Sequence, residues 1–392
     1  RYVAFDPLVP VWCVTPETGR TIHRFFDTSP FSPSGRYLGL TRLPAEDRLP
    51  TPGEVAEIVL VDLYTGQERV VAQSRGWDTQ LGAQVQWGAA DHRLYFNDLD
   101  VDTWRPFGVE LDPFSGARRE LGGTIYMVAP DGKRAVSPCL LRIGRSQPGY
   151  GIIVPPDYVP MNRGAPAEDG LYITDTSSGV CRMLVSLQEI TETARPALPL
   201  DEYRNGDFYA FHVKWNPQGD RLMLVLRWIP HRQQARTRSQ LITMKADGTD
   251  VQVALQASAW DRGGHHPNWC PDGTSILMNL RIQGPVPSGR YARRLARLYR
   301  RARRGLQIRD DGMRFVYFRY DGTGRHALDD HILGSGHPTL HLDGRHIVTD
   351  AYPHEPAAFG DGTTPIRLID LDNGRATALV RINTRPPYRG PR

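Results

Sequence analysis

The chain has 392 residues, of which 40% are hydrophobic and 23% are charged, a composition typical of a globular protein. This composition excludes collagen, coiled coil and wholesale disorder, and no apolar run reaches the ~18–20 residues of a membrane span. The net charge of +5 is uneven, because residues 289–304 hold eight arginines and no acid. Cys13, Cys139, Cys181 and Cys270 are far apart and indicate no disulfide framework.

The elements predicted along the chain begin with a hairpin over 11–26, followed by six similar segments. Each segment has a short apolar strand, a Pro-x-Gly-like turn and a second strand: 31–40, 85–96, 127–136, 213–226, 268–280 and 339–350. A second hairpin follows each of them, with Gly beside Asp, Thr, Ser or Asn at its turn, where a positive φ is needed. Two hairpins make a four-stranded antiparallel blade.

Repeated four-stranded units predict a β-propeller, because a β-sandwich would not repeat the same turn at matched places. We expect one all-β domain over 1–392, of the seven-bladed type. The predicted blades are 27–73, 82–122, 123–187, 207–256, 262–329 and 334–381, with the outer hairpin of a closing blade at 8–26. The inner strands of that last blade are not found before the C-terminus. We therefore expect a fragment or an open ring, and the start at Arg1 indicates a processed end or a fragment.

Repeat-equivalent positions on the inner strands define a ring at the entrance of the central channel. The alignment places there Thr28, Gln84, Ile125, His212, His266 and His337. Three converging imidazoles suit a divalent metal such as zinc, manganese or copper. The alternative is three channel histidines that bond water and carbonyl groups.

The long loops between second and third strands share this rim and carry further candidates. The loop 137–169 contains Tyr150 in QPGYG and Arg163 in MNRGAP. Glycines on both sides open Tyr150 to solvent, although it could instead pack over the prolines of its own loop. Tyr209 lies three residues before His212 and is as compatible with the core as with a site.

Two more segments of this rim carry polar side chains. The segment 22–30 holds His23, Arg24 and Asp27, and the segment 350–364 holds His354. A basic insert at 284–312 has apolar residues at helical spacing. We interpret it as a lid or a clamp for an anionic polymer rather than a nucleic-acid contact, because no nucleic-acid motif accompanies it.

The motifs HRFFDTSPFSPSGRY, LGAQVQWG, GGHHPNW with PDG, GSGHP and DAYPHEP resemble those of seven-bladed propeller polysaccharide lyases. These are the ulvan lyases, the rhamnose–glucuronate lyases and, more distantly, the oligogalacturonate lyases. The resemblance extends from Pro10 to about Val380. It implies a lyase that cleaves a uronate-containing anionic polysaccharide or oligosaccharide by β-elimination. It also implies a secreted or periplasmic protein, and we expect a monomer.

The resemblance assigns roles to particular residues. Tyr150 is the base or the acid, Arg163 neutralises the carboxylate, and Tyr209 is a supporting acid or a sugar contact. A divalent metal (zinc, manganese or calcium), structural or site-organising, is held by His212, His266 and His337. The substrate-binding residues are His23, Arg24, Gln84, Trp104 and His354.

The chain departs from this family in blade two, where these lyases usually carry two histidines. Gln84 and Trp104 stand at or near those positions, and glutamine cannot act as a general base near neutral pH. Three alternatives therefore stay open. One is a rhamnosidase-like hydrolase that uses His23, the second is a non-catalytic glycan-binding propeller, and the third is an assembly propeller of the TolB type.

Overall fold

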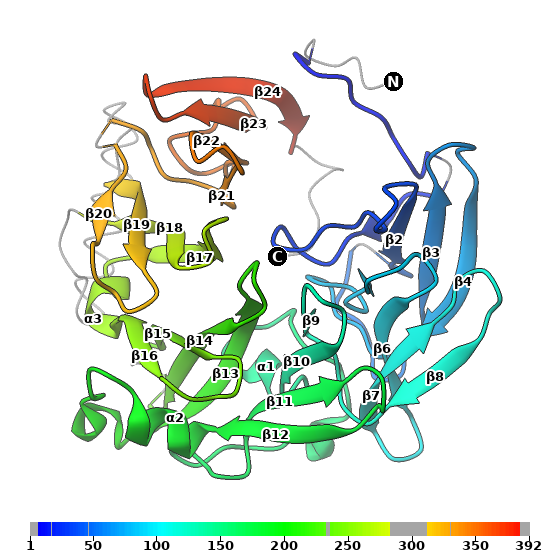
Figure 1. Ribbon diagram of the computed structural model, residues 1–392, viewed down its shortest axis with the longest axis horizontal. Helices are drawn as coiled ribbons and strands as arrows, with labels where there is room; N and C mark the ends of the chain where they lie inside the picture. Colours follow the sequence, from blue (N-terminus) through cyan, green and yellow to red (C-terminus); the bar gives the residue numbers. More distant parts are fainter. Residues whose placement is uncertain are drawn as a thin grey trace. The chain divides into compact units, whose positions relative to one another are not determined.

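The computed structural model describes residues 7–16, 18–45, 47–232, 236–282, 312–329 and 331–384. Over these residues the strands form six four-stranded sheets, each in the order of the chain (Figure 1). The short helices are α1 (Ile143–Ser146), α2 (Leu187–Thr193) and α3 (Ala257–Trp260), with 3-10 turns η1 (Pro156–Tyr158) and η2 (Leu200–Tyr203). No helix within the described ranges is long and apolar enough to cross a membrane.

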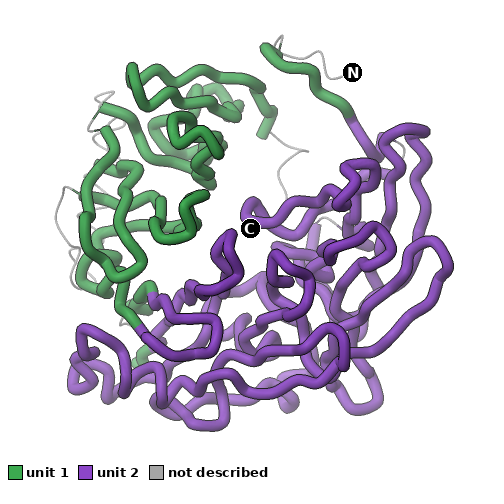
Figure 2. The backbone as a smooth tube through the Cα atoms, viewed as in Figure 1, with its two compact units in different colours: residues 1–12, 230–241, 252–389 green, residues 13–229, 242–251, 390–392 purple. Residues whose placement is uncertain are grey.

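The chain divides into two compact units, which are described separately (Figure 2). Unit 1 is Arg1–Trp12, Pro230–Leu241 and Gln252–Arg389, and unit 2 is Cys13–Ile229, Ile242–Val251 and Gly390–Arg392. Unit 2 contains the first three sheets and strand β13. Unit 1 contains strand β16 and the last two sheets.

The first three sheets are meanders of successive hairpins. Their strands are β1 (Thr21–Ile22), β2 (Tyr37–Arg42), β3 (Ala56–Asp62), β4 (Glu68–Ser74), β5 (Gln86–Trp87), β6 (Leu94–Asp100), β7 (Arg105–Leu111), β8 (Arg118–Leu121), β9 (Met127–Val128), β10 (Arg134–Pro138), β11 (Gly170–Asp175) and β12 (Cys181–Ser186). All pairings in them are antiparallel. In these three sheets each innermost strand has two residues and the middle strands are longer.

The last three sheets have the same strand order, in which each strand lies beside the next one along the chain. Their strands are β13 (Gly206–Trp215), β14 (Arg221–Pro230), β15 (Arg238–Lys245), β16 (Gln252–Leu255), β17 (Gly264–Trp269), β18 (Ser275–Arg281), β19 (Met313–Arg319), β20 (His326–Ala327), β21 (Thr339–Leu340), β22 (His346–Thr349), β23 (Thr363–Asp370) and β24 (Arg375–Asn383). The fold is thus all-β, as predicted.

The middle strands are buried on both faces because neighbouring sheets of a unit pack against each other. Six of the seven residues of β6 are buried, and Leu94 and Phe96 share one apolar cluster with Ile58 of β3 and Val109 of β7. A strand covered on both sides is expected to be apolar at successive positions rather than alternately. This packing explains the successive apolar residues at the start of β6, Leu94, Tyr95 and Phe96.

The repeated inner turn has a backbone cause. Its glycines all have a left-handed φ: Gly35 (74°), Gly132 (70°), Gly219 (70°), Gly273 (66°) and Gly344 (69°). Glycine adopts this conformation without the steric penalty of a side chain. The Pro-x-Gly-like signal therefore marked the hairpins of the sheets correctly.

The prediction of seven blades is wrong, because the described strands make six sheets. Thr21 and Ile22 do not belong to a seventh outer hairpin; they pair with Arg42 and Thr41 of β2 as the inner strand of the first sheet. The inner strand continues at Phe31, which forms a β-bridge with Leu38. Residues 23–30 are therefore a loop that interrupts the inner strand of the first sheet. Pro10 and Pro16, which lack an N–H donor, disfavour a ladder over 8–26.

The basic insert, predicted over 284–312, lies outside the described residues except for Gly312. Its interpretation as a lid or a clamp stays a prediction.

Candidate functional site

The loop over 23–30, in unit 2, contains a buried arginine. Arg24 is 2% exposed. Its Nε donates to the carbonyl oxygen of Tyr126 at 2.7 Å, and its Nη1 donates to Asp27 Oδ1 at 2.5 Å. The guanidinium also lies 4.7 Å from the centroid of the Tyr126 ring. These contacts fix Arg24 in one orientation, because a buried charge is costly unless it is paired.

Lys214 on β13 shares the Asp27 carboxylate with Arg24. Lys214 Nζ lies 2.8 Å from Asp27 Oδ2, and the two side chains are 3% and 1% exposed. Burial by itself raises the pKa of Asp27, but Lys214 and Arg24 outweigh it and hold that pKa well below its usual range. Asp27 is therefore ionised at neutral pH. Two cations against one carboxylate leave a positive excess in the interior of unit 2.

His212 lies two residues before Lys214 on β13, hence on the same face of the strand. Its Nδ1 is hydrogen-bonded to the Tyr126 hydroxyl, and the Tyr150 ring approaches it edge-on with centroids 5.3 Å apart. Burial, with Lys214 and Arg227 nearby, holds the pKa of His212 well below 6.5. His212 is therefore a neutral imidazole at physiological pH.

Tyr150 keeps its proton beside this neutral imidazole. Burial, followed by the charge of Asp78, raises the pKa of the Tyr150 phenol far above its usual range. The ring is 6% exposed and makes an edge contact with Phe211 at 5.0 Å. The interior thus holds one group that can accept a proton and one that can donate a proton.

Arg227 on β14 adds a cation that no carboxylate in the described part of the chain balances. Its guanidinium lies 3.6 Å from the centroid of Phe211, and its Nη1 donates to the Ser146 carbonyl at 3.0 Å. Its Nε is buried without a hydrogen-bond partner among the described residues. Burial lowers the pKa of Arg227 to about 10, so the side chain stays protonated at neutral pH.

Asp78 holds the loop of Tyr150 in place. Its Oδ2 accepts the Gly151 N–H at 2.8 Å, and the neighbouring Thr79 Oγ1 donates to the Gly149 carbonyl at 3.2 Å. Gly149 and Gly151 have φ of 89° and 88°. A Cβ on Gly151 would lie 2.5 Å from the Leu140 carbonyl oxygen, so glycine is a steric requirement at position 151.

Arg163 and Tyr209 lie apart from these contacts. Arg163 is exposed, whereas Tyr209 is 2% exposed and its hydroxyl accepts the Asn162 N–H at 3.3 Å. Tyr209 and His212 are three positions apart on β13 and therefore face opposite sides of the strand. The predicted catalytic roles of Arg163 and Tyr209 stay untested, but Arg227 is the arginine that accompanies Tyr150.

The two blade-two candidates have unusual backbones. Gln84 has φ of 59° and Trp104 has φ of 56°, although neither is glycine. Gln84 is 2% exposed, whereas Trp104 is half-buried with its ring 6.1 Å from that of Tyr158. His23 is exposed beside the buried Arg24. Left-handed residues other than glycine often mark functional positions.

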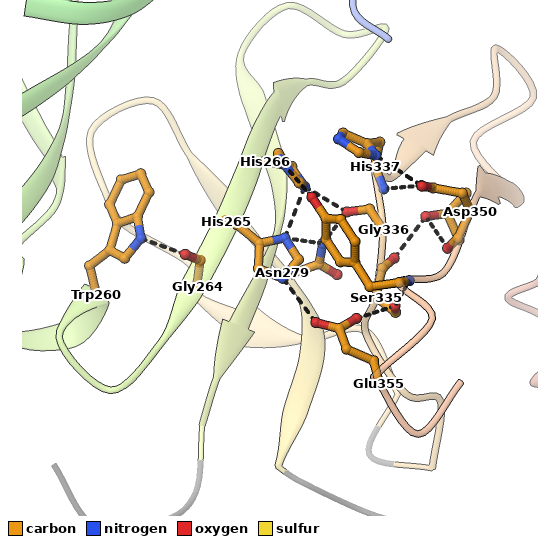
Figure 3. Close-up of polar contacts among 12 residues, drawn as sticks. Trp260, Gly264, His265, His266, Asn279, Ser335, Gly336, His337, Asp350 and Glu355 are labelled. Atoms are coloured by element: carbon orange, nitrogen blue, oxygen red, sulfur yellow. Dashed lines mark hydrogen bonds and ion pairs between the residues drawn. The ribbon is translucent and has the colours of Figure 1, made fainter. Parts of the chain in front are cut away.

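A second polar group lies in unit 1, where β17 faces the segment before β21 (Figure 3). His266, with φ of 56°, has its Nδ1 2.8 Å from the Gly336 carbonyl and 2.9 Å from His265 Nδ1. Since a carbonyl only accepts, His266 carries its hydrogen on Nδ1 and the lone pair on Nε2. The Tyr352 hydroxyl lies 3.3 Å from that Nε2.

His337 stacks on His266 with ring centroids 3.8 Å apart. Its Nδ1 lies 3.0 Å from Asp350 Oδ1, an arrangement that also directs the neutral-form lone pair to Nε2 (Figure 3). His265 Nε2 lies 3.6 Å from Glu355 Oε1. His354, a predicted substrate contact, is exposed in this unit and stacks on Tyr352 at 5.6 Å.

The predicted metal set is divided between the units. His266 and His337 belong to unit 1 and His212 belongs to unit 2. Two imidazoles with Nε2 lone pairs suit a divalent cation in part. However, in the ranges that the structure describes, no group of three or more His, Cys, Asp or Glu side chains could hold a metal ion. The described residues do not complete a metal site, and the three-histidine set stays a prediction.

The sequence analysis did not identify four residues that the structure places around His212 and Tyr150. These are Asp78, Tyr126, Lys214 and Arg227. A signal existed for Lys214, because an i, i+2 pair on a strand shares a face. None existed for the others, since segments remote in sequence bring them together.

The comparisons with known proteins concern the fold. No family model and no curated protein matches the chain. An oligogalacturonate lyase in complex with manganese is 14% identical with a TM-score of 0.54, over 92% of this chain and 78% of that one. The oligogalacturonate lyase of Vibrio parahaemolyticus is 12% identical with a TM-score of 0.53, over 93% and 80%. The TolB-type structure from Agrobacterium tumefaciens is 15% identical, over 83% and 89%, with a TM-score of 0.41.

At these identities the likeness shows a shared fold and not a shared reaction. The chain is an all-β propeller of six four-stranded sheets in the described residues, and its fold is similar to that of the two oligogalacturonate lyases, a group that the sequence resemblance named as more distant. The relation to the ulvan and rhamnose–glucuronate lyases stays a prediction.

Proposed function

We propose that this protein is a polysaccharide lyase that cleaves a uronate-containing glycan by β-elimination inside unit 2. One observation carries the proposal. The cations Arg24, Lys214 and Arg227 surround a neutral imidazole and a protonated phenol, with Asp27 as the carboxylate held ionised among them. A positive interior of this kind attracts an anionic sugar and presents a base and an acid to it.

The first requirement of the reaction is a neutralised carboxylate. The hydrogen at C5 of a uronate is weakly acidic, and a cation at the carboxylate stabilises the negative charge that develops when the proton leaves. Arg227 suits this role because Asp27 does not pair with it and its Nε is buried without a protein acceptor in the described chain. In our proposal Arg227 replaces Arg163 as the neutralising group.

The proton transfers use His212 and Tyr150. His212 Nε2 takes the proton from C5 while its Nδ1–H donates to the Tyr126 oxygen. The C5–H electrons form the C4=C5 double bond, and the C4–O4 bond breaks with its electron pair on O4. Tyr150 gives its proton to that oxygen. The two rings lie 5.3 Å apart, so they can serve adjacent atoms of one sugar ring.

These roles refine those that the family resemblance implies. The raised pKa of Tyr150 favours the acid role over the base role. The lowered pKa of His212 favours a base that is already deprotonated at neutral pH. The oligogalacturonate lyase fold supports the substrate class, and the manganese in one of those structures motivates the test with added metal below. We also propose an exported monomer, on the family resemblance alone.

The test is ultraviolet absorbance during incubation with oligogalacturonate, ulvan and a rhamnose–glucuronate-capped arabinogalactan, with and without divalent metal. The unsaturated uronate product absorbs, so a lyase gives a rising signal. Tyr150→Phe should lower the rate at least about 100-fold, the usual contribution of a general acid. Tyr158→Phe, at an exposed tyrosine of η1, is the matched control and should keep full activity.

Other outcomes would contradict this assignment. Full activity in Tyr150→Phe would remove Tyr150 from the mechanism. Release of free rhamnose without a rise in absorbance would indicate the hydrolase, with His23→Ala as its test. Glycan binding with no product under any metal condition would indicate a non-catalytic binding propeller.

A further inference from the structure

A pocket in unit 1 is lined by residues of α3 and of strands β18, β19 and β20 (Figure 1). Its volume is about 460 Å³, within the ~300–1,000 Å³ range of small-molecule sites. The lyase reaction proposed for unit 2 uses none of the residues that line it, and none of them belongs to the predicted site. The pocket is therefore a feature of the fold without a role so far.

Three arginines and no acid stand among the described residues that line the pocket: Arg262, Arg281 and Arg325. Arg262 and Arg325 are exposed, and neither guanidinium has an ion pair or a hydrogen bond within the described ranges. Asp261, the acid next to Arg262, lies instead 3.1 Å from Arg238 Nε through its Oδ2. Two guanidinium charges therefore line the pocket without a carboxylate to neutralise them.

Arg281, the last residue of β18, is positioned by Gly263. Its N–H donates to the Gly263 carbonyl at 2.8 Å, and its Nε lies 3.3 Å from the position that a Gly263 Cβ would take. Gly263 also has φ of 123°, which residues with a side chain rarely adopt. Glycine at this position thus lets the Arg281 side chain pack over the backbone beside the pocket.

His326 adds a hydrogen-bond acceptor to this basic wall. Its Nδ1 lies 2.7 Å from the Gly324 carbonyl oxygen, and the centroid of the Tyr317 ring lies 5.6 Å from that of the imidazole. Since a carbonyl only accepts, the neutral imidazole carries its hydrogen on Nδ1 and the lone pair on Nε2. The pocket therefore offers guanidinium donors and one acceptor beside the buried apolar side chains of Leu280 and Val316.

We propose that this pocket binds two neighbouring uronate residues of an anionic glycan, with Arg262 and Arg325 on the carboxylates and His326 Nε2 accepting from a ring hydroxyl. It is a second glycan site, which shares no residue with the lyase site and holds the polymer without cleaving it. The inference goes beyond the proposed reaction, but it rests on that proposal for the identity of the ligand as a uronate glycan.

The chemistry of the wall favours this ligand class over others. Two guanidinium groups without a carboxylate partner match two negative charges, and an oligouronate carries one carboxylate on each sugar ring. A neutral glycan would leave both cations without a partner. A nucleotide is disfavoured, because no Phe, Tyr or Trp among the described lining residues offers a face on which a base could stack. Sulfate would pair with the arginines, but it has no hydrogen to donate to His326 Nε2.

Arginine modification measures the occupancy of this pocket directly. Phenylglyoxal reacts with exposed guanidinium groups, and mass spectrometry of the peptides follows each arginine separately in Tyr150→Phe, which should not consume the ligand. At about ten times its Kd, trigalacturonate should slow the modification of Arg262 and Arg325 about tenfold. Arg375, an exposed arginine of β24, is the matched control and should react at an unchanged rate. No protection of Arg262 and Arg325, or equal protection by sulfate at the same concentration, would overturn the proposal.

Calorimetry with trigalacturonate separates the pocket from the lyase site. In Tyr150→Phe we expect two molecules bound per chain. Adding Arg262→Gln and Arg325→Gln should leave one, because the loss of both charge-assisted contacts weakens binding at the pocket about 100-fold. Arg375→Gln, added instead, should leave two.

The number of bound molecules distinguishes the two proposals. One molecule in Tyr150→Phe and none after the two arginine substitutions would mean that the pocket binds the glycan while the lyase site does not. The same number before and after these substitutions, or no binding at all, would overturn the pocket.

Discussion

Asp78 gives a prediction whose magnitude follows from its surroundings. It is 2% exposed, and burial raises its pKa to about 7 from an ordinary 3.8, against the opposing N–H bonds from Leu81, Gly151 and Gln80. The folded protein therefore binds a proton that the unfolded chain releases between about pH 4 and pH 7. Stability from this group is fully present below pH 3.8 and is lost as the pH rises through 7.

Asp78→Asn removes this titration. At 1.36 kcal/mol per pH unit, the wild type loses about 3 kcal/mol of unfolding free energy from Asp78 between pH 5 and pH 8. The variant does not, so its stability relative to wild type should rise by about that amount over the same range. A separate, pH-independent loss of about 1–3 kcal/mol is expected when the new amide group meets the Gly151 N–H.

Urea unfolding of both proteins at pH 5, 6, 7 and 8, followed by circular dichroism, measures this difference. Asp157→Asn, at an exposed aspartate of η1, controls for the removal of a surface carboxyl. A difference between Asp78→Asn and wild type that is the same at pH 5 and pH 8 would refute the reasoning. It would mean that Asp78 is ionised in the folded protein throughout this range.

The remaining predictions concern the same interior. Gly151 has φ of 88°, and a Cβ there would lie 2.3 Å from Ile143 Cγ2, so Gly151→Ala should lower the unfolding free energy by about 1–3 kcal/mol and remove most of the lyase activity. Gly164→Ala, whose Cβ would meet nothing within 4 Å, should lower the unfolding free energy less. Equal melting temperatures for the two variants would contradict the tight packing of the Tyr150 loop. Lys214→Met should cost about 3–5 kcal/mol in urea unfolding, because it leaves Asp27 with one cation; an unchanged midpoint would mean that the pair is not buried. The lyase rate should rise with pH below 6.5, because the pKa of His212 is lowered, and it should fall again near the pKa of Arg227, about 10. A rising limb with its midpoint at 6.5 would exclude His212 as the base.

Strained backbones at matched positions deserve a functional explanation. Gln84 and His266 are equivalent in the predicted inner-strand ring, and both are left-handed, with φ of 59° and 56°. Neither is glycine, so each conformation is maintained by its own contacts: Gln84 by Leu81 and Gln86, and His266 by Gly336. Both residues stay predicted binding positions, and the costly φ that they share is the structural observation that supports the prediction.

Much of the fold could be predicted, because each blade is a local structure. The turn glycine, the adjacent apolar strand and the second hairpin lie within about 50 residues of one another, so the repeats could be read directly. The blade count could not. The segment 11–26 has the composition of a hairpin, but Thr21 and Ile22 pair with β2, and only the presence of that strand edge selects this partner.

The candidate site, like the fold, could be predicted only in part. The repeats alone predicted histidines at equivalent places in the later blades, a tyrosine between two glycines at position 150, and an arginine and an aspartate in one short segment at 24 and 27. The folded chain was needed to show that Asp27 pairs with Lys214, that Asp78 accepts the Gly151 N–H, and that Arg227 rather than Arg163 lies near Tyr150. The physical reason is that burial and charge pairing depend on neighbours that are tens to nearly two hundred residues away along the chain. No local pattern encodes the burial and the neighbouring charges that lower the pKa of His212 and raise that of Tyr150.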